Sequence, residues 1–335
     1  MASRSHKQLG EFELISRLCA GIRLGRRTIL GPGDDCAIIS ASRRNLLLTV
    51  DSMVEGVHFD LRWGRPALLG ARSLAVNLSD IAAMGGSPTA CVVNLAVRDG
   101  VGQRTLDRIY AGLRNSAHEA GVDIVGGNIT RASDLSITIA LLGEVTGGAA
   151  MRRDSARPGD EIFVTGALGD AALGWRLLSG ELTARGVARS YLVDRFFRPP
   201  NRLRAGQRLA AIDPTPSAID ISDGLLQDLG HILERSRVGA EIDASSIPLS
   251  PAYRAVMGDD ISYAFSGGED YELLFCLRPG YRESELTRRL RAPVRRIGRI
   301  TRQKRLEVIG SLQPDLSKHG AGWDQLRSSP LKRLD

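Results

Sequence analysis

Six short apolar segments of the sequence each end in, or run directly into, an acidic or amide residue near glycine. These segments contribute Asp34 and Asp35 in GPGDD, Asp51 in LLLTVDS, Asp80 in AVNLSD, Asn128 in DIVGGN, Asp220 and Asp223 in AIDISDG, and Glu269 and Asp270 in AFSGGED. Acidic and amide side chains at several strand ends can act together only if the fold brings some of them into one site. Mg²⁺ binds one or two carboxylates per ion and completes its octahedral shell with water and phosphate oxygens. The pattern therefore predicts a metal-dependent enzyme that uses ATP.

Other phosphate-binding and catalytic motifs are absent from the sequence. It contains no GxxxxGK[ST] phosphate-binding loop and no HRD or DFG motif of protein kinases. The glycine-rich run Gly166–Gly174 lacks the G-x-G-x-x-G spacing of a dinucleotide site, and serine–histidine–acid hydrolysis is unsupported. Without a phosphate-binding lysine, the charge of a triphosphate has to be neutralised by metal ions and arginines. This requirement explains the number of carboxylates.

Length and composition are those of a folded protein with two domains. At 335 residues the chain is long for one core, and 43% apolar with 25% charged residues is an ordinary globular composition. The formal net charge of +7 says little about partners. Ten basic residues lie between Arg282 and Arg305 against two glutamates, a density that could attract nucleic acid or a membrane surface. Tyr281 is the only aromatic residue beside them, so we expect a solvated helix and strand there and no nucleic-acid partner.

Cysteine usage and the lengths of apolar runs indicate a soluble protein. The four cysteines are far apart, form no CxxC pair, and are expected to be buried reduced thiols. The N-terminal segment lacks the apolar core of a signal peptide, and no run approaches the ~20 apolar residues of a membrane span. We expect a cytoplasmic protein without a membrane partner.

Strand and helix patterns alternate in both halves of the chain. Pro66–Met84 is expected to form a long helix, since proline suits a first turn and a following glycine pair would end it. A short strand is expected at Leu46–Asp51 and a strong strand at Leu135–Val145. The pattern breaks at Gly147–Asp160, which is the best candidate for a boundary. It predicts two mixed α/β domains, at residues 1–149 and 150–335.

The motifs occur in the order and spacing of a known family. From Gly10 towards Trp323 the chain carries GEFELI, GPGDDCA, DSMVEGVHF, AVNLSDIAAMG, IVGGN, RPGD, IDISDGLLQDLGH and SGGEDYELLF. Each short motif alone is weak, but the ordered set is specific. The sequence resembles the thiamine-monophosphate kinase family, within the superfamily typified by aminoimidazole ribonucleotide synthetase and selenophosphate synthetase. EGVHF together with SGGEDYEL favours this kinase family over its relatives.

The resemblance implies a fold and a reaction. The fold would consist of two mixed α/β domains of the aminoimidazole ribonucleotide synthetase-like type, with the N-terminal sheets of two subunits paired in a homodimer. The reaction would transfer the γ-phosphoryl group of ATP directly and in line to thiamine monophosphate, giving thiamine diphosphate and ADP. Several Mg²⁺ ions would bridge the two substrates, and no side chain would act as a covalent catalyst.

The resemblance also implies roles for individual residues. The Mg²⁺ ligands would be Asp34, Asp35, Thr49, Asp51, Asp80, Asn128, Asp220 and Asp223. The ATP contacts would come from Tyr110, Gly126, Gly127, Asn128, Arg153 and Ser222. Thiamine monophosphate would be bound by His58, Glu269 and Trp323. These roles agree with the chemistry, because phosphoryl transfer depends on positioning and charge neutralisation, and an aromatic face and a carboxylate suit the cationic thiamine.

Two positions depart from the family pattern. Asn128 stands where the family usually has aspartate, and Val50 stands beside Asp51 where a hydroxyl residue is common. Asparagine keeps an oxygen ligand but loses a charge, so one Mg²⁺ ion would bind more weakly or through water. We interpret both as tuning changes that preserve activity, and we expect Asn128→Asp to lower the Mg²⁺ concentration needed for half-maximal rate.

Two alternatives remain open at this point. The chain could be another ATP-dependent synthetase of the same superfamily that acts on a different acceptor. It could instead be a catalytically silent nucleotide- or RNA-binding relative that uses the basic stretch Arg282–Arg305. ATP turnover without dependence on thiamine monophosphate would indicate the first alternative. Salt-dependent RNA affinity without turnover would indicate the second.

Overall fold

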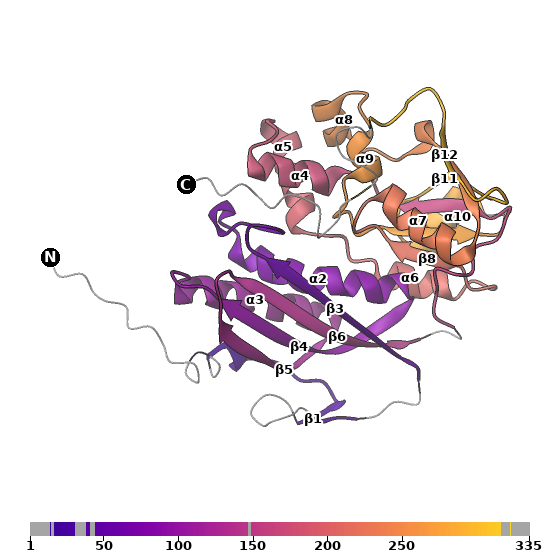
Figure 1. Cartoon of the computed structure of the whole chain (residues 1–335). Coiled ribbons are helices and arrows are strands. Elements are labelled where there is room, and N and C mark those ends of the chain that lie inside the picture. Colours follow the sequence, from indigo (N-terminus) through magenta and orange to yellow (C-terminus); the bar gives the residue numbers. More distant parts are fainter. Residues whose placement is uncertain are drawn as a thin grey trace.

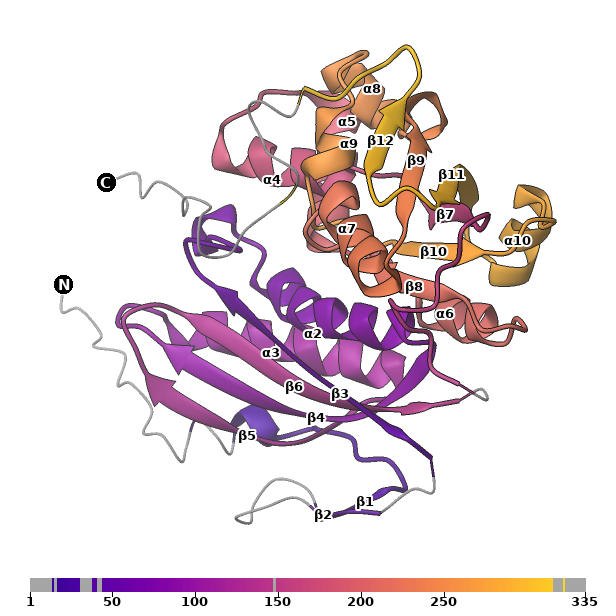
Figure 2. The same cartoon turned by 45° about the vertical axis from the view of Figure 1, so that its right-hand side comes forward.

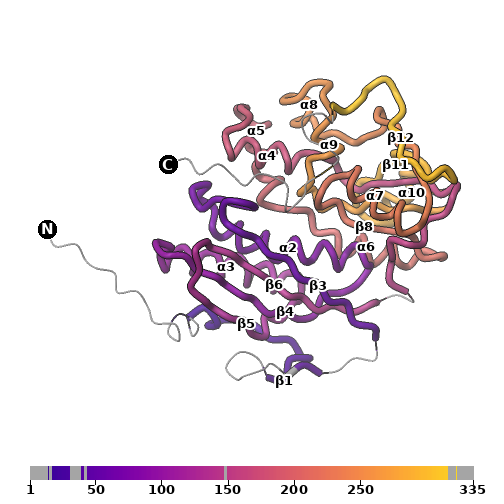
Figure 3. Tube along the Cα trace, viewed as in Figure 1, coloured from indigo at the N-terminus to yellow at the C-terminus, as the bar shows by residue number. Residues whose placement is uncertain are grey.

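The computed structural model describes residues 14, 17–30, 38–40, 44–146, 149–315 and 322 (Figure 1). Within them, a four-stranded sheet lies in the N-terminal half, a six-stranded sheet lies in the C-terminal half, and a short hairpin is separate from both. In Figure 3 the indigo-to-magenta half of the chain lies below the orange-to-yellow half. Among the described residues, no helix is both long and apolar enough to cross a membrane.

The N-terminal half is a sheet with helices on one face (Figure 2). Its described elements are β1 (Thr28–Leu30), β2 (Ile38–Ile39), β3 (Leu46–Val54), the 3-10 helix η1 (Leu61–Trp63), α2 (Pro66–Ala83), β4 (Gly86–Val97), α3 (Gln103–Ala120), β5 (Asp123–Arg131) and β6 (Ser136–Val145). The strand order is β3-β6-β4-β5. Strands β4 and β5 are parallel, and the other neighbours are antiparallel. Helices α2 and α3 cover one face, whereas among the described residues the other face is open, with Val50 and Val92 exposed on it.

Side-chain alternation along β3 decides which residues reach the helices. Thr49, Asp51 and Met53 are at least half-buried on the side of α2. Leu48 and Val50, at the alternate positions, are 74% and 61% exposed. One side of the strand therefore supplies core and polar groups beneath α2, and the other supplies an apolar surface open to solvent.

The C-terminal half is a larger sheet with helices on both faces. Its described elements are β7 (Glu161–Thr165), α4 (Asp170–Ser179), α5 (Gly186–Phe197), α6 (Leu203–Ala210), β8 (Ser217–Asp220), α7 (Leu225–Ser236), β9 (Gly239–Asp243), the 3-10 helix η2 (Ala244–Ser246), α8 (Pro251–Met257), α9 (Ser262–Ser266), β10 (Leu273–Leu277), α10 (Glu283–Leu290), β11 (Val294–Thr301) and β12 (Leu306–Ile309). The strand order is β12-β9-β11-β7-β10-β8, in which β12 and β9 are parallel and the other neighbours antiparallel. Phe163 of β7 stacks on Phe275 of β10 in the core shared with α6 and α10, whereas Val164 faces the core shared with α4, α5 and α7.

Helix α6 packs against α2 and so joins the two halves. A Cβ atom on Gly206 of α6 would lie 2.0 Å from the carbonyl oxygen of Ala82 on α2, so glycine permits this close approach. The boundary expected between residues 149 and 150 stays a prediction. The contact nevertheless fixes where the C-terminal loops stand relative to α2.

Most elements lie where the sequence patterns place them. The expected long helix is α2, which begins with Pro66 and ends one residue before Met84. The mixed α/β class of both halves is confirmed. Strand β5 runs on to Arg131, beyond the apolar run that ends at Val125, because its glycine pair still forms partners with β4. The short helices α8 and α9 have too few residues to produce a helical apolar pattern.

Candidate active site

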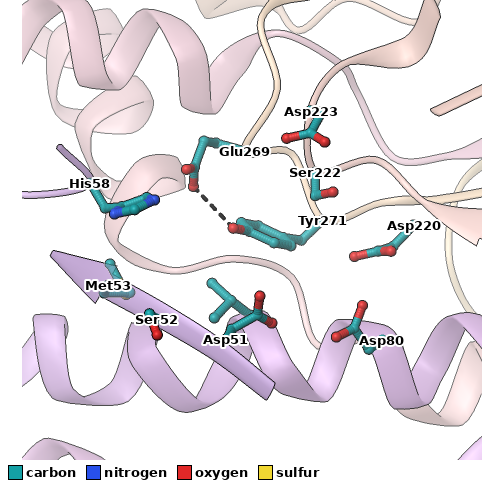
Figure 4. Close-up of a pocket in the computed structure, with 11 residues that line it drawn as sticks. Asp51, Ser52, Met53, His58, Asp80, Asp220, Ser222, Asp223, Glu269 and Tyr271 are labelled. Carbon is teal, nitrogen blue, oxygen red and sulfur yellow. Dashed lines mark hydrogen bonds between the residues drawn. The ribbon is translucent and has the colours of Figure 1, made fainter. Parts of the chain in front are cut away.

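A cavity of about 210 Å³ lies where the two halves meet (Figure 4). Its walls come from β3 and the turn after it, from α2, and from the loops that follow β8 and precede β10. It is lined by Asp51, Ser52, Met53, His58, Val76, Asp80, Asp220, Ser222, Asp223, Glu269 and Tyr271. The fold therefore brings together many of the carboxylates expected from the sequence, with His58 and Ser222 beside them.

One face of helix α2 lines this cavity and reaches both halves. Val76, Ser79 and Asp80 lie on the same side of the helix, because positions three and four apart are neighbours there. The Ser79 hydroxyl donates a hydrogen bond of 2.7 Å to Oδ2 of Asp220, at the end of β8. Asp80 accepts a hydrogen bond from the hydroxyl of Thr49 on β3. Consecutive residues of α2 thus contact strands from different sheets.

Carboxylates crowd around these contacts. Burial, followed by repulsion from Asp80 and Asp220, raises the pKa of Asp51 to about 7. Burial and then repulsion from Asp80 raise the pKa of Asp220 to about 7 as well. Burial also raises the pKa of Asp80, opposed by the Thr49 hydrogen bond and by the positive charge of Arg153. Buried negative charges that repel one another are stabilised by bound cations.

The oxygen atoms at the cavity suit hard divalent cations. Among the described residues, no three His, Cys, Asp or Glu side chains already lie close enough to enclose an ion. Mg²⁺ bound to one or two carboxylates, with phosphate oxygens completing its shell, is compatible with that spacing. The side chains that could hold such ions are Asp51, Asp80, Asp220 and Asp223, with the Thr49 hydroxyl beside them.

A buried aspartate that had no expected role shapes the loop after β8. Asp228 is 2% exposed and accepts hydrogen bonds from the backbone N–H groups of Ser222, Asp223 and Gly224 at 3.0, 3.1 and 3.1 Å. Burial, then the charges of Asp220 and Asp223, raises the pKa of Asp228 to about 8. The available signal was an acidic residue in the first turn of the helix that follows SDG.

The loop before β10 interlocks with the loop after β8. The backbone N–H of Glu269 donates to the Ser222 carbonyl at 2.7 Å, and that of Tyr271 donates to the Ile221 carbonyl at 2.8 Å. Gly268 has a φ of 66°, and a Cβ atom there would lie 2.6 Å from the Ser222 carbonyl oxygen. Glycine is required for this approach, and the SGGED motif thereby places Glu269 at the cavity.

An arginine that was not expected at the site holds Glu269. Arg72 of α2 is 1% exposed and forms an ion pair with Oε2 of Glu269. The Tyr271 hydroxyl donates to the same oxygen at 3.2 Å (Figure 4). The signal in the sequence was the spacing of Arg72 from Asp80, since eight residues are about two turns of one helix face.

His58 is oriented by the turn that carries it. Its Nδ1 accepts a hydrogen bond of 3.1 Å from the backbone N–H of Val54, so the neutral ring carries its proton on Nε2. In Figure 4 the ring lies beside Glu269. A smaller adjoining cavity of about 30 Å³ is lined by Val57, His58, Ala172, Trp175, Arg176, Ser222, Gly267, Gly268 and Glu269. It adds an aromatic residue, Trp175, that the sequence motifs did not indicate.

The glycine–asparagine segment of β5 lies apart from the cavity within one chain. Strand β5 is the sheet edge opposite β3, and Asn128 there donates a hydrogen bond from Nδ2 to Oδ1 of Asn94 at 3.0 Å. Strand register places Asn128 in one row with Asn94, Thr138 and Ser52, on the opposite face from Asp51. The single chain therefore does not bring Asn128, or the preceding Gly126 and Gly127, to the carboxylates.

Two further residues expected to bind ATP have different surroundings. Arg153 is exposed, and its charge opposes the rise in the pKa of both Asp80 and Asp220. Tyr110 is buried on α3 in the N-terminal core, where burial raises the pKa of its phenol. Arg153 thus acts on the cavity electrostatically, whereas Tyr110 does not line it.

Some expected ligands lie outside the described residues, namely Asp34, Asp35 and Trp323. Gly322 is described, and a Cβ atom on it would lie 2.9 Å from the carbonyl oxygen of Asp223. The chain therefore passes the edge of the cavity one residue before Trp323.

Comparison with known proteins assigns the chain to a family. The model of the AIR synthase related protein, N-terminal domain, matches residues 33–145, and that of the C-terminal domain matches residues 157–311. The thiamine-monophosphate kinase of Escherichia coli (strain K12) is 41% identical over 271 residues, which are 79% of this chain and 82% of that protein. The chain belongs to the thiamine-monophosphate kinase family.

Solved structures of this family share the fold. The thiamine-monophosphate kinase of Stenotrophomonas maltophilia K279a superposes with a TM-score of 0.77 at 37% identity, over 90% of this chain and 95% of that one. AaThiL complexed with AMPPCP and TMP superposes with a TM-score of 0.74 at 31% identity, over 97% of this chain and 100% of that one. The two-domain fold expected from the family resemblance is thereby confirmed.

Proposed function

We propose that the protein transfers the γ-phosphoryl group of ATP to thiamine monophosphate, forming thiamine diphosphate and ADP. The observation that carries this proposal is the cavity itself, in which buried carboxylates from both halves meet His58 and Glu269 in a member of this kinase family. A kinase relative solved with a nucleotide analogue and TMP supports both substrates. Direct transfer between the substrates needs positioning and charge neutralisation from the protein, which suits a cavity lined by several carboxylates.

Several Mg²⁺ ions would be held by Asp51, Asp80, Asp220 and Asp223, with Thr49 as a further oxygen ligand. Bound there, Mg²⁺ supplies the positive charge that lets two phosphate-bearing substrates approach each other. The protein's own part is to hold these oxygens in place: Ser79 fixes Asp220, and Thr49 fixes Asp80. Asp34 and Asp35 are proposed as further ligands from the sequence alone.

The nucleotide and the acceptor would both be bound at this cavity, by different side chains. Ser222, in the loop that Asp228 shapes, and exposed Arg153 are proposed to contact the triphosphate. His58 and Glu269 are proposed to bind thiamine monophosphate, with Trp323 as a stacking partner. The contact of Tyr110 with the nucleotide stays a prediction of the sequence.

We also propose that the protein is a homodimer that pairs the open faces of its N-terminal sheets. Leu46, Leu48 and Val50 of β3 expose more than half of their surface there, and Val92 of β4 exposes 43%. Apolar groups of this extent on one sheet face are typical of an interface. Asn128 lies on the same face, so pairing would bring GGN against another subunit. The cytoplasmic location stays a prediction.

In the basic stretch Arg282–Arg305, four of the ten basic residues form ion pairs with described carboxylates, among them Arg305 with Glu307. On β11, Arg295 pairs with Glu283, Arg296 with Glu161, and Arg299 with Glu241. These carboxylates reduce the positive charge available to a phosphate backbone. RNA binding through this stretch is therefore not favoured by any specific contact.

The test is turnover of purified protein with Mg·ATP, with and without thiamine monophosphate, with products separated by chromatography. Thiamine diphosphate formed in step with ADP is the expected result. ADP formed independently of thiamine monophosphate would assign the site to another acceptor. The absence of turnover at every Mg²⁺ concentration would contradict the proposal.

A further inference from the structure

Arg72 forms the centre of a buried cluster between the two halves. Its guanidinium, on α2, pairs with Glu269 in the loop before β10 and donates a hydrogen bond to the carbonyl of Phe196 on α5. It also lies 4.1 Å from the centroid of the Phe196 ring and 5.6 Å from that of Tyr271. Every one of these partners belongs to the C-terminal half.

Stability alone is a weak reason for this cluster. Removing a guanidinium from water is expensive, and replacing a buried ion pair with apolar side chains is often neutral or stabilising. Nε of Arg72 has no hydrogen-bond partner among the described residues. The arrangement therefore leaves part of the buried charge uncompensated, and its position beside the cavity indicates a functional reason.

The two carboxylate oxygens of Glu269 differ in their hydrogen-bond partners. Oε2 accepts hydrogen bonds from both Arg72 and Tyr271. Oε1 has no hydrogen-bond donor among the described residues, and the Glu269 side chain is 27% exposed at the cavity. One oxygen is thus tied to the protein, and the other remains available to a ligand.

We propose that Arg72 is a positioning residue for thiamine monophosphate. Together with Tyr271 it holds Glu269 by Oε2, so that Oε1 can accept a hydrogen bond from the amino group of the substrate's aminopyrimidine ring. This inference rests on the proposed function. Arg72 and Asp80 are eight residues apart on one helix, about 12 Å along its axis. Helix α2 therefore sets the distance between the acceptor's ring and the phosphoryl-transfer site.

The test is a double-mutant cycle that compares Arg72→Met, Glu269→Gln and the double variant with the wild-type protein. KM is measured for thiamine monophosphate and for ATP in each. Arg72→Met is expected to raise KM for thiamine monophosphate about tenfold, as expected for a weakened charged hydrogen bond. KM for ATP should change by less than about twofold. In the Glu269→Gln background, Arg72→Met should add almost nothing, because Arg72 acts through that carboxylate. Arg72→Lys should recover part of the loss.

Arg65→Met is the matched control. Arg65 is an exposed arginine at the start of α2, lies 5.3 Å from the ring centroid of Phe197 on α5, and forms no ion pair with Glu269. The Arg65→Met substitution removes this cation–aromatic contact between the halves. It should leave the KM values for both substrates within about twofold of the wild-type values. Tyr271→Phe removes only the hydroxyl that donates to Glu269, so it provides a mild variant if Arg72→Met fails to fold. It should raise KM for thiamine monophosphate about threefold.

Three outcomes would overturn the inference in an active enzyme. They are an unchanged KM for thiamine monophosphate in Arg72→Met (in Tyr271→Phe, if Arg72→Met does not fold), an equal rise in KM for ATP, and an undiminished effect of Arg72→Met in the Glu269→Gln background. A wild-type protein that forms no thiamine diphosphate would instead overturn the proposed function. The two failures are therefore distinguishable.

Discussion

The hydroxyl of Ser79 lies 2.7 Å from Oδ2 of Asp220, and this hydrogen bond joins α2 in the N-terminal half to β8 in the C-terminal half. The next residue on α2, Asp80, accepts from Thr49 on β3. A single turn of helix therefore sets the relative position of carboxylates that belong to different sheets. The geometry of the proposed phosphoryl-transfer site depends on this turn.

Ser79→Ala is expected to destabilise the protein by about 1–3 kcal/mol, because buried Asp220 loses a hydrogen bond. Ser73→Ala is the matched control, since Ser73 is also buried on α2 but donates to the Gly70 carbonyl of its own helix. Urea unfolding followed by circular dichroism measures both changes. Equal losses in the two variants would contradict a specific role for the bond between the halves.

Asp220→Asn is expected to stabilise the metal-free protein while it lowers activity. The substitution removes a charge that raises the pKa of Asp51, and the asparagine oxygen can still accept from Ser79. We expect a gain of roughly 1 kcal/mol in unfolding free energy without Mg²⁺ and a fall in kcat of about 100-fold.

Thermal unfolding with and without Mg²⁺ checks the stability part of that prediction. Mg²⁺ should raise the melting temperature of the wild-type protein more than that of Asp220→Asn. A metal-free variant less stable than the metal-free wild type would contradict the repulsion between these carboxylates.

Gly268→Ala is expected to destabilise the protein by about 1–3 kcal/mol, because alanine is strained at a φ of 66°. Its Cβ would also press against the Ser222 carbonyl and separate the interlocked loops, so KM for thiamine monophosphate should rise. Gly230→Ala in α7 is the control: a Cβ there meets nothing within 4 Å, and helix propensity predicts a gain of about 0.5–1 kcal/mol. Differential scanning calorimetry measures the stability of both variants. If Gly268→Ala leaves both the stability and KM for thiamine monophosphate unchanged, the close contact between the two loops is not required.

Asn128→Asp is expected to lower the Mg²⁺ concentration that gives half-maximal rate, because it restores a charged oxygen ligand. The rotation of the Asn94 amide can preserve the hydrogen bond between these neighbours. Initial rates over a Mg²⁺ titration measure the effect. An unchanged curve would remove Asn128 from the metal shell.

Leu48→Glu is expected to weaken the proposed dimer, because it places a charge on the exposed apolar face of β3. Sedimentation velocity should show a dimer for the wild-type protein and a monomer for the variant. Val187→Glu is the control, since Val187 on α5 is 87% exposed but lies in the C-terminal half. A wild-type monomer at micromolar concentration would contradict the proposal.

The carboxylates of the site could be predicted from the sequence, whereas their supporting partners could not. Asp51 follows the apolar run LLLTV within β3, and Asp220 is the last residue of the short strand β8, so a local pattern marks each of them. Arg72 sits among apolar residues of a helix, and its partner Glu269 is 197 positions away. No local pattern identifies a pair of that separation.

The order of the strands in the sheet likewise could not be predicted from local sequence patterns. The motifs place Asp51 and Asn128 in one list of metal ligands, but the sheet order β3-β6-β4-β5 puts them on opposite edges. The alternation of side chains then turns Asn128 to the open face. The order of the strands and the face on which a side chain lies both depend on long-range strand pairing. They decide whether two residues expected to bind metal can come together within one chain.

The most direct test of the whole account follows the γ-phosphoryl group itself. Protein incubated with Mg²⁺, thiamine monophosphate and ATP labelled at the γ-phosphorus should yield labelled thiamine diphosphate in step with ADP. Asp80→Asn, which changes a carboxylate that lines the cavity, should abolish that transfer while the protein stays folded. Label that never reaches thiamine diphosphate, or that reaches it equally well in Asp80→Asn, would contradict the account.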